Sequence, residues 1–375
     1  MLRGLLTPFA HPLFTAWTGI AVGVSEHEVS VFVMTSPARL TLAQSMPSHP
    51  GSRKLGILPT PNCVRVAEYR LAMTTTLDWY GCATFGLQTA GLSIMLDAYI
   101  DRAANAAGPS PARSASDIAE CDYLVIGHSH FDHLFGAEAI MANTKATLIG
   151  SYETVRVMEG LGVPLERMFP VAGGETIELE GAAGDATVSV YPSQHSCVWS
   201  HSQMGQSDEV CIGDLDVTYH EQQERFAKLI EHLGTALDPL AVEHMMSTMA
   251  EHSDRGDGGA LVFLFDLPDG RLFYQDTSGH WSGVLSELRP DVAILAAAGR
   301  GNINGEPIQG SLAQFMARQV DMLRPKQVIL SHHDDWLPGF SVPTDIGPIR
   351  AEIERVVPGT ELREIGYVES NVVFG

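Results

Sequence analysis

Residues 128–133 read His-Ser-His-Phe-Asp-His and place four potential metal ligands, His128, His130, Asp132 and His133, close together in the chain. An apolar run at 122–127 precedes them and predicts a buried strand, while 134–140 has the pattern of a helix start. Imidazole and carboxylate groups bind zinc, iron or manganese, and a loop at the end of a buried strand can hold them toward one point. A solvated polar turn is the alternative, but the order of strand, ligand loop and helix favours half of a metal site.

This arrangement resembles the metallo-β-lactamase superfamily, which carries a His-x-His-x-Asp-His loop in the same setting. The resemblance covers the chain from about Met73 to its C-terminus, and in this family the remaining ligands follow later strands. The matching positions here are His195 after the run at 188–192, Asp276 after the run at 271–275, and His332 after the run at 327–331. Gln275 stands where the family usually has a glycine, and His333 is an alternative to His332.

The resemblance implies a site for two divalent metal ions, with zinc favoured and manganese or iron as alternatives. One ion would take His128, His130 and His195, the second would take Asp132, His133 and His332, and Asp276 would bridge them. Water bound between two cations loses a proton near neutral pH, so a metal-bound hydroxide would be the nucleophile. Asp132 would also orient the hydroxide or shuttle a proton, which makes it the candidate catalytic residue.

The rest of the second half of the chain alternates strand and helix patterns. Two strands are predicted at Leu261–Leu267 and 271–275, joined by the turn Pro268-Asp269-Gly270. Buried strands at 292–298 and Gln327–Ser331 flank a helix at Leu312–Leu323. This is an α/β pattern, and the resemblance implies a four-layer αββα metallo-β-lactamase sandwich over residues 73–375, with the ligand loops at one edge.

Residues 197–258 are too long for a simple connection and predict an insertion with its own structure. Apolar residues recur at helical spacing in two parts of it, and Asp238-Pro239 can start the second helix. We expect a helical lid that caps the metal site and shapes an apolar substrate pocket, with methionines that adapt to irregular ligands. Core packing, or contact between copies in a homo-oligomer, is the alternative.

Residues 1–72 differ from the rest and are expected to be an N-terminal extension that is disordered or, if translation starts at Met73, not translated. The apolar stretch at 13–24 is about half as long as a membrane span, and no small-residue cleavage site follows it. The stretch at 35–61 is rich in Ser, Pro and Thr, which favours disorder or loose packing. No membrane span is expected, and five scattered cysteines favour a reducing, cytoplasmic location.

The formal net charge of −22 argues against a nucleic-acid partner, because such binding depends on clustered Lys and Arg. A neutral small-molecule substrate is expected instead. The chain resembles the broad group of predicted metal-dependent hydrolases that includes the ascorbate-phosphate lactonases, which favours cleavage of a small ester, lactone or related bond. A phosphodiesterase acting on a small or lipid phosphodiester and an iron-dependent sulfur dioxygenase are the alternatives.

Overall fold

The computed structural model describes residues 19–25, 28–36, 39–47, 74–200, 209–252 and 257–374. The chain divides into two compact units, Met1–Val64 and Arg65–Gly375. The first unit contains an antiparallel sheet of β1 (Gly19–Ser25), β2 (Glu28–Ser36) and β3 (Arg39–Pro47). Residues 1–18 and 48–73, including the alternative start at Met73, lie outside the described residues, so the expected extension stays a prediction.

The second unit is built on two large sheets, and the first has the strand order β20-β4-β5-β6-β7-β8-β9. Its strands are β4 (Thr76–Gly81), β5 (Thr84–Thr89), β6 (Leu92–Leu96), β7 (Tyr123–Val125), β8 (Thr147–Ser151), β9 (Met168–Val171) and β20 (Asn371–Val372). The strands from β6 to β9 are parallel, whereas β20, β4, β5 and β6 pair antiparallel. The carboxyl ends of β6 and β7 therefore lie at the same edge.

The second sheet has the order β10-β11-β12-β13-β15-β18-β19. Its strands are β10 (Thr176–Glu178), β11 (Thr187–Pro192), β12 (Leu261–Leu267), β13 (Gly270–Tyr274), β15 (Val292–Ala296), β18 (Gln327–Ser331) and β19 (Glu361–Arg363). The hairpin predicted around residues 268–270 is confirmed as β12 and β13. A small sheet of β14 (Gly279–His280), β16 (Asn302–Ile303) and β17 (Glu306–Pro307) is described separately from it.

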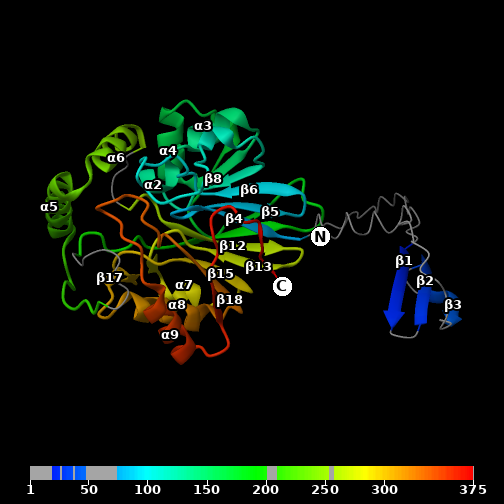
Figure 1. Ribbon diagram of the computed structural model, residues 1–375. Helices are drawn as coiled ribbons and strands as arrows, with labels where there is room; N and C mark the ends of the chain where they lie inside the picture. The colour runs from blue at the N-terminus through cyan, green and yellow to red at the C-terminus, as the bar shows by residue number, and fades with distance from the viewer. Residues whose placement is uncertain are drawn as a thin grey trace, which may run out of the picture. The chain divides into compact units, whose positions relative to one another are not determined.

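Alternating side chains place each large sheet between two apolar layers. In β7, Val125 points into the core shared by the two sheets, while Leu124 faces the helices outside. In β12, Phe263 joins the shared core and Leu264 joins the opposite outer layer. The outer helices are α3 (Ala137–Asn143) and α4 (Tyr152–Gly160) on one side, and α7 (Ser282–Leu285), α8 (Leu312–Leu323) and α9 (Ile346–Val356) on the other (Figure 1). The predicted αββα sandwich is confirmed.

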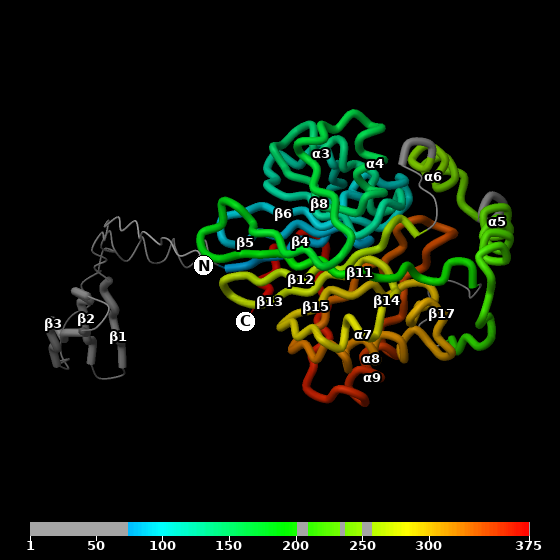
Figure 2. Tube along the Cα trace, turned by 180° about the vertical axis from the view of Figure 1, so that it is seen from behind, coloured from blue at the N-terminus to red at the C-terminus, as the bar shows by residue number. Residues whose placement is uncertain are grey.

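The described part of 197–258 contains two helices, α5 (Tyr219–Ala236) and α6 (Pro239–His252), as the sequence predicted. Asp238 accepts a hydrogen bond of 2.9 Å from the Leu240 N–H and so caps the start of α6. Helix α6 contacts the short helix α2 (Phe131–Leu134), and both insertion helices lie at one end of the sandwich (Figure 2).

Among the described residues, no helix combines the length and hydropathy needed to span a membrane. Two short 3₁₀ turns, Ala115–Asp117 and Leu165–Arg167, complete the elements.

Candidate metal centre

Two glycines shape the ligand loop that follows β7. A Cβ on Gly127 would overlap with a carboxylate oxygen of Asp276, so only glycine lets the loop pass this side chain. Gly136 has a left-handed backbone (φ 99°), and a Cβ there would lie 2.8 Å from the Ala98 carbonyl oxygen. This glycine separates α2 from α3, so the helix predicted at 134–140 is two helices, and Asp132 and His133 lie within the first of them.

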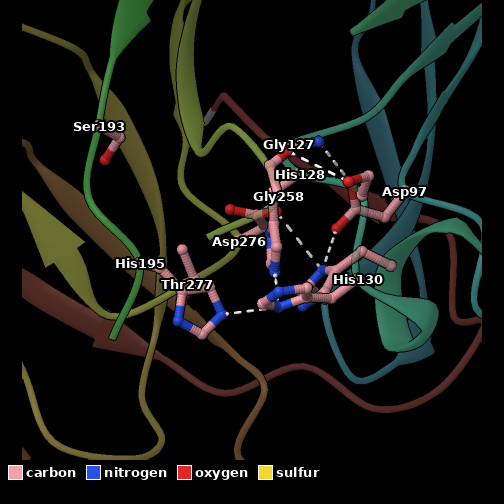
Figure 3. A network of polar contacts seen from close by, with 12 residues as sticks. Asp97, Gly127, His128, His130, Ser193, His195, Gly258, Asp276 and Thr277 are labelled. Atoms are coloured by element: carbon pink, nitrogen blue, oxygen red, sulfur yellow. Dashed lines mark hydrogen bonds and ion pairs between the residues drawn. The ribbon is translucent and has the colours of Figure 1, made fainter. Parts of the chain in front are cut away.

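The first ligand group consists of His128, His130 and His195, whose rings point toward one another across the two sheets (Figure 3). His130 Nδ1 lies 3.0 Å from His128 Nε2 and 3.0 Å from His195 Nε2. A hydrogen on His130 Nδ1 can form a hydrogen bond to only one of the two neighbouring nitrogens. A cation bound by all three nitrogens explains why both distances are short. Nitrogens bound to one tetrahedral zinc ion stand about 3.3 Å apart, so the donor set fits a metal ion.

Hydrogen bonds on the far side of the rings leave the facing nitrogens available as ligands. His128 Nδ1 lies 2.6 Å from Asp276 Oδ2, and His195 Nδ1 lies 2.8 Å from the Ser196 carbonyl oxygen. Each Nδ1 therefore donates its hydrogen outward, and Nε2 keeps its lone pair for a metal. Burial lowers the pKa of His128 well below its usual value and that of His195 to about 4, so both rings are neutral near pH 7.

The second ligand group consists of Asp132, His133 and His332. Asp132 Oδ2 lies 3.2 Å from His332 Nε2 and 3.4 Å from His133 Nε2. Although burial raises the pKa of Asp132, the two histidines outweigh it and hold that pKa well below its usual value. Burial likewise lowers the pKa of His133, but Asp132 and Asp97 raise it well above normal. This group therefore holds charge where the first group is neutral.

Asp276 follows β13 as predicted and is fully buried. Its Oδ2 accepts the hydrogen bond from His128 and lies 3.5 Å from His133 Nδ1, so it braces the first group from behind. Its Oδ1 is buried and has no hydrogen-bond partner in the described structure. An unpartnered buried carboxylate oxygen suits a cation, and the predicted bridging role, which stays a prediction, depends on this atom.

His332 rather than His333 points to the site. The His332 N–H donates to the Cys82 carbonyl oxygen at 2.8 Å, and its ring faces Asp132. The His333 ring stacks on Trp79, with 4.7 Å between the ring centroids and 6° between the planes. The structure thus places the preferred residue in the second ligand group and gives its neighbour a packing contact.

Asp97 lies at the site without having been assigned a role from the sequence. Its Oδ2 is 2.6 Å from His133 Nδ1 and accepts from the Tyr274 hydroxyl at 2.8 Å, while its Oδ1 accepts from the Gly127 N–H. Burial raises the pKa of Asp97 to about 6. Its position directly after β6 was the only available signal, because parallel strands bring their carboxyl ends to one edge of a sheet.

Cys82 is the second residue that sequence reasoning missed. It lies in the turn between β4 and β5, is fully buried, and forms a potential ligand group with Asp132 and His332. No short motif surrounds this cysteine, so its approach to the site depends on tertiary structure. The Arg300 guanidinium is buried, pairs with Asp214 at 3.1 Å and also contacts Ser200.

Residues 93–214 match a family model described as a β-lactamase superfamily domain. The matched part includes the ligand loop and His195 and ends before Asp276 and His332. A UPF0173 metal-dependent hydrolase of Methanopyrus kandleri is 29% identical over 143 residues, which are 38% of this chain and 55% of that protein. Another, of Pyrobaculum arsenaticum, is 32% identical over 122 residues, which are 32% of this chain and 50% of that protein. The chain spans about half the length of these curated relatives.

Among solved structures, Igni18, a novel metallo hydrolase from the hyperthermophilic archaeon Ignicoccus hospitalis, has 16% sequence identity and a TM-score of 0.50. The alignment covers 79% of this chain and 97% of that chain. At this identity the likeness concerns the fold alone. Together, the domain match and the four-layer architecture show that the chain has the metallo-β-lactamase fold and resembles metal-dependent hydrolases of that superfamily.

Proposed function

We propose that this chain is a metal-dependent hydrolase that cleaves a small ester, lactone or related bond. The observation that carries the proposal is the convergence of three potential metal-binding groups. They are His128 with His130 and His195, His128 with His133 and Asp276, and Asp132 with His332 and Cys82. The first group is neutral and the second contains a carboxylate, a combination that suits divalent ions of the transition series. The names of the curated relatives support the same activity class.

The first group would hold one ion and the second group another, with zinc favoured for its imidazole and carboxylate ligands. Such ions would supply Lewis acidity toward the scissile carbonyl and lower the pKa of bound water. Asp132 stays ionised at neutral pH, because His133 and His332 outweigh the effect of its burial. Its carboxylate can therefore orient a water molecule and accept its proton.

An uncharged substrate fits the charges around the site better than a phosphodiester does. Arg102 lies beside the second group, but its buried guanidinium forms an ion pair of 2.9 Å with Asp334. The Arg300 carbonyl oxygen accepts from the Cys197 N–H at 2.9 Å, and its guanidinium forms an ion pair with Asp214. Phosphoryl groups are usually met by accessible Arg or Lys side chains, whereas both of these guanidinium groups are buried and each forms an ion pair.

An apolar cluster beside the second group supports the same choice. Trp336 packs edge-on against His332, with 5.0 Å between ring centroids, and also contacts Phe131, the neighbour of Asp132. The insertion adds Leu237, Ala241 and Met245 to this cluster. The insertion, residues 197–258, would therefore be the wall that receives the apolar part of the substrate.

Hydrogen bonds on α6 and at the C-terminal end of the insertion connect that wall to the part of the domain that carries the ligand loop. The Tyr99 hydroxyl lies 2.9 Å from His244 Nε2 on α6, and Tyr99 packs edge-on against Phe131. At the other end of the insertion, the Gly258 carbonyl oxygen accepts from the Ser129 N–H at 3.2 Å. We propose that these contacts make the helix pair a fixed lid rather than a separate module.

A cytoplasmic location belongs to the same proposal. The described cysteines Cys82, Cys121, Cys197 and Cys211 are all free thiols. Free thiols on a chain with no described disulfide suit a reducing compartment. Protease protection of the native protein in intact and lysed cells would test this location.

The test of the function is the initial rate of the purified full chain on lactones, carboxylic esters and phosphodiesters, before and after chelation and zinc add-back. We expect turnover of lactones or esters that chelation removes and zinc restores. His332→Gln should lose most of this activity, whereas His333→Gln, which changes only the neighbouring stacked ring, should keep it. Metal-loaded protein that cleaves only phosphodiesters, or none of the panel, would contradict the proposal.

A further inference from the structure

We propose that Cys82 is a thiolate ligand of the ion in the second ligand group. This inference rests on the proposed function, because it assumes that a divalent ion binds Asp132 and His332. The ligand atoms of Cys82, Asp132 and His332 all lie within 4.8 Å of one another. Sulfur, imidazole and carboxylate are all zinc ligands, so the three side chains form a donor set for zinc.

The sulfur points toward the second ligand group. Cys82 is fully buried, and its thiol donates a hydrogen bond of 3.6 Å to the backbone carbonyl oxygen of Asp132, a residue of that group. A thiol is a weak donor, so this bond does not compete strongly with a metal ion for the sulfur. On metal binding the thiol proton would leave to solvent, as it does for other thiolate ligands.

The backbone of Cys82 is hydrogen-bonded directly to that of His332. The Cys82 carbonyl oxygen accepts from the His332 N–H at 2.8 Å and from Trp79 Nε1 at 3.1 Å. Both Cys82 (φ 47°) and His332 (φ 59°) have left-handed backbone conformations, which cost energy in residues other than glycine. The two ligand-bearing turns are thus held to each other, and the positions of the sulfur and the ring nitrogen are fixed together.

A buried ion pair supports the cysteine turn from the other side. The Cys82 N–H lies 3.0 Å from Asp334 Oδ1, and Asp334 is paired with Arg102 and bonded to the Tyr367 hydroxyl. A Cβ on Gly81 would overlap with the Arg102 guanidinium, so glycine lets the arginine close over the turn. This support limits movement of Cys82 away from the site.

Cys121 shows what a packing thiol looks like in the same domain. It is also buried, but its Sγ contacts the Tyr123 carbonyl oxygen at 3.1 Å and it belongs to the outer apolar layer beside α3 and α4. It lies in none of the potential ligand groups of the described residues. Cys121→Ser is therefore a matched control for Cys82→Ser: each exchanges one buried sulfur for oxygen.

A thiolate at the second position would make the two positions chemically different. Cys82, Asp132 and His332 would supply a thiolate, a carboxylate and an imidazole, whereas the first group would supply three imidazoles and leave one tetrahedral position open for water or substrate. A soft thiolate also favours zinc over manganese at the second position, because manganese prefers oxygen ligands.

The experiment is cobalt substitution of the full chain, followed by near-ultraviolet absorption and metal analysis. We expect two cobalt ions per chain and a sulfur-to-cobalt charge-transfer band that survives in Cys121→Ser and disappears in Cys82→Ser. X-ray absorption of the zinc-loaded wild-type protein needs no variant. It should show one sulfur neighbour at about 2.3 Å for every two zinc ions, because only the second ion would bind the thiolate.

The outcomes separate this inference from the proposed function. Two bound ions without a charge-transfer band or a sulfur neighbour would overturn the role of Cys82 and leave the metal-dependent hydrolase intact. A band that persists in folded Cys82→Ser would also overturn it. A full chain that binds no divalent ion under any loading condition would overturn both.

Discussion

The two ligand groups adjoin each other but are built on different principles. The first consists of three imidazoles, and the outward nitrogens of His128 and His195 are tied to Asp276 and to a backbone carbonyl. The second mixes a carboxylate with imidazoles, is braced by Asp97, and has a buried thiol beside it. The neutral group suits an ion that stays strongly Lewis acidic, while the charged group suits an ion that is held firmly.

The strongest test of this comparison removes the centre of the first group. In His130→Ala the nitrogen that lies between His128 Nε2 and His195 Nε2 is lost. We expect one metal ion per chain instead of two and turnover below detection, measured by metal analysis and initial rates. His220→Ala, which changes an exposed histidine on α5, is the control and should behave as wild type. Two retained ions with normal turnover would show that the first group does not hold the reactive ion.

The next effect concerns the charge of the second group. Asp132→Asn keeps the shape of the side chain but removes its charge and its ability to accept a proton. We expect kcat to fall by ~10²–10⁴-fold, the usual contribution of a general acid–base group. The first ion should remain bound, because His128, His130 and His195 are unchanged. Equal loss of both ions would mean that the two groups bind as one unit.

The sequence analysis assigned three residues to each group but missed Cys82 and Asp97, for a physical reason. The ligand loop is local, so its spacing alone points to His128, His130, Asp132 and His133, and the family resemblance adds one histidine after a later strand to each group. The approach of Cys82 depends on contacts between distant segments. Cys82 and His332 meet only because the β4–β5 turn and the end of β18 are hydrogen-bonded to each other in the folded domain.

The fold itself was largely predictable, because its strands are short apolar runs with clear turns. Strand β18 and helix α8 have the predicted bounds, and the αββα order follows from the family resemblance. The break between α2 and α3 was not predicted, because it depends on Gly136 meeting the Ala98 carbonyl. Such a contact between segments leaves no local pattern in the sequence.

A third prediction decides whether Asp276 belongs to one group or to both. Asp276→Asn keeps an oxygen that can accept from His128 Nδ1 but weakens any bridge between two ions. If the residue only braces His128, the affinity of the first ion should fall by ~10–100-fold, as for other outer-shell partners, and the second ion should stay. Competition with a chromophoric chelator measures both affinities. Comparable loss of both ions would establish the bridge and weaken the contrast between the groups.

The smallest expected effect comes from the hydrogen bond that attaches the insertion beside the second ligand group. Tyr99→Phe removes the hydroxyl that lies 2.9 Å from His244 Nε2 but keeps the ring contacts with Phe131 and Trp336. We expect the free energy of unfolding to fall by about 1 kcal/mol. KM for an apolar ester should rise a few fold while kcat stays near wild type, because the wall loosens and the ligands are untouched.

The matching substitution is His244→Phe, which removes the other partner of the hydrogen bond between Tyr99 and His244. In a double-mutant cycle the two substitutions should be non-additive, with a coupling energy close to the single loss, since each removes one interaction. Tyr152→Phe, on an exposed tyrosine of α4, controls for loss of a hydroxyl and should leave stability and KM unchanged. Additive effects of Tyr99→Phe and His244→Phe would mean that the hydrogen bond does not attach α6, and the insertion would then act independently of the ligand group beside it.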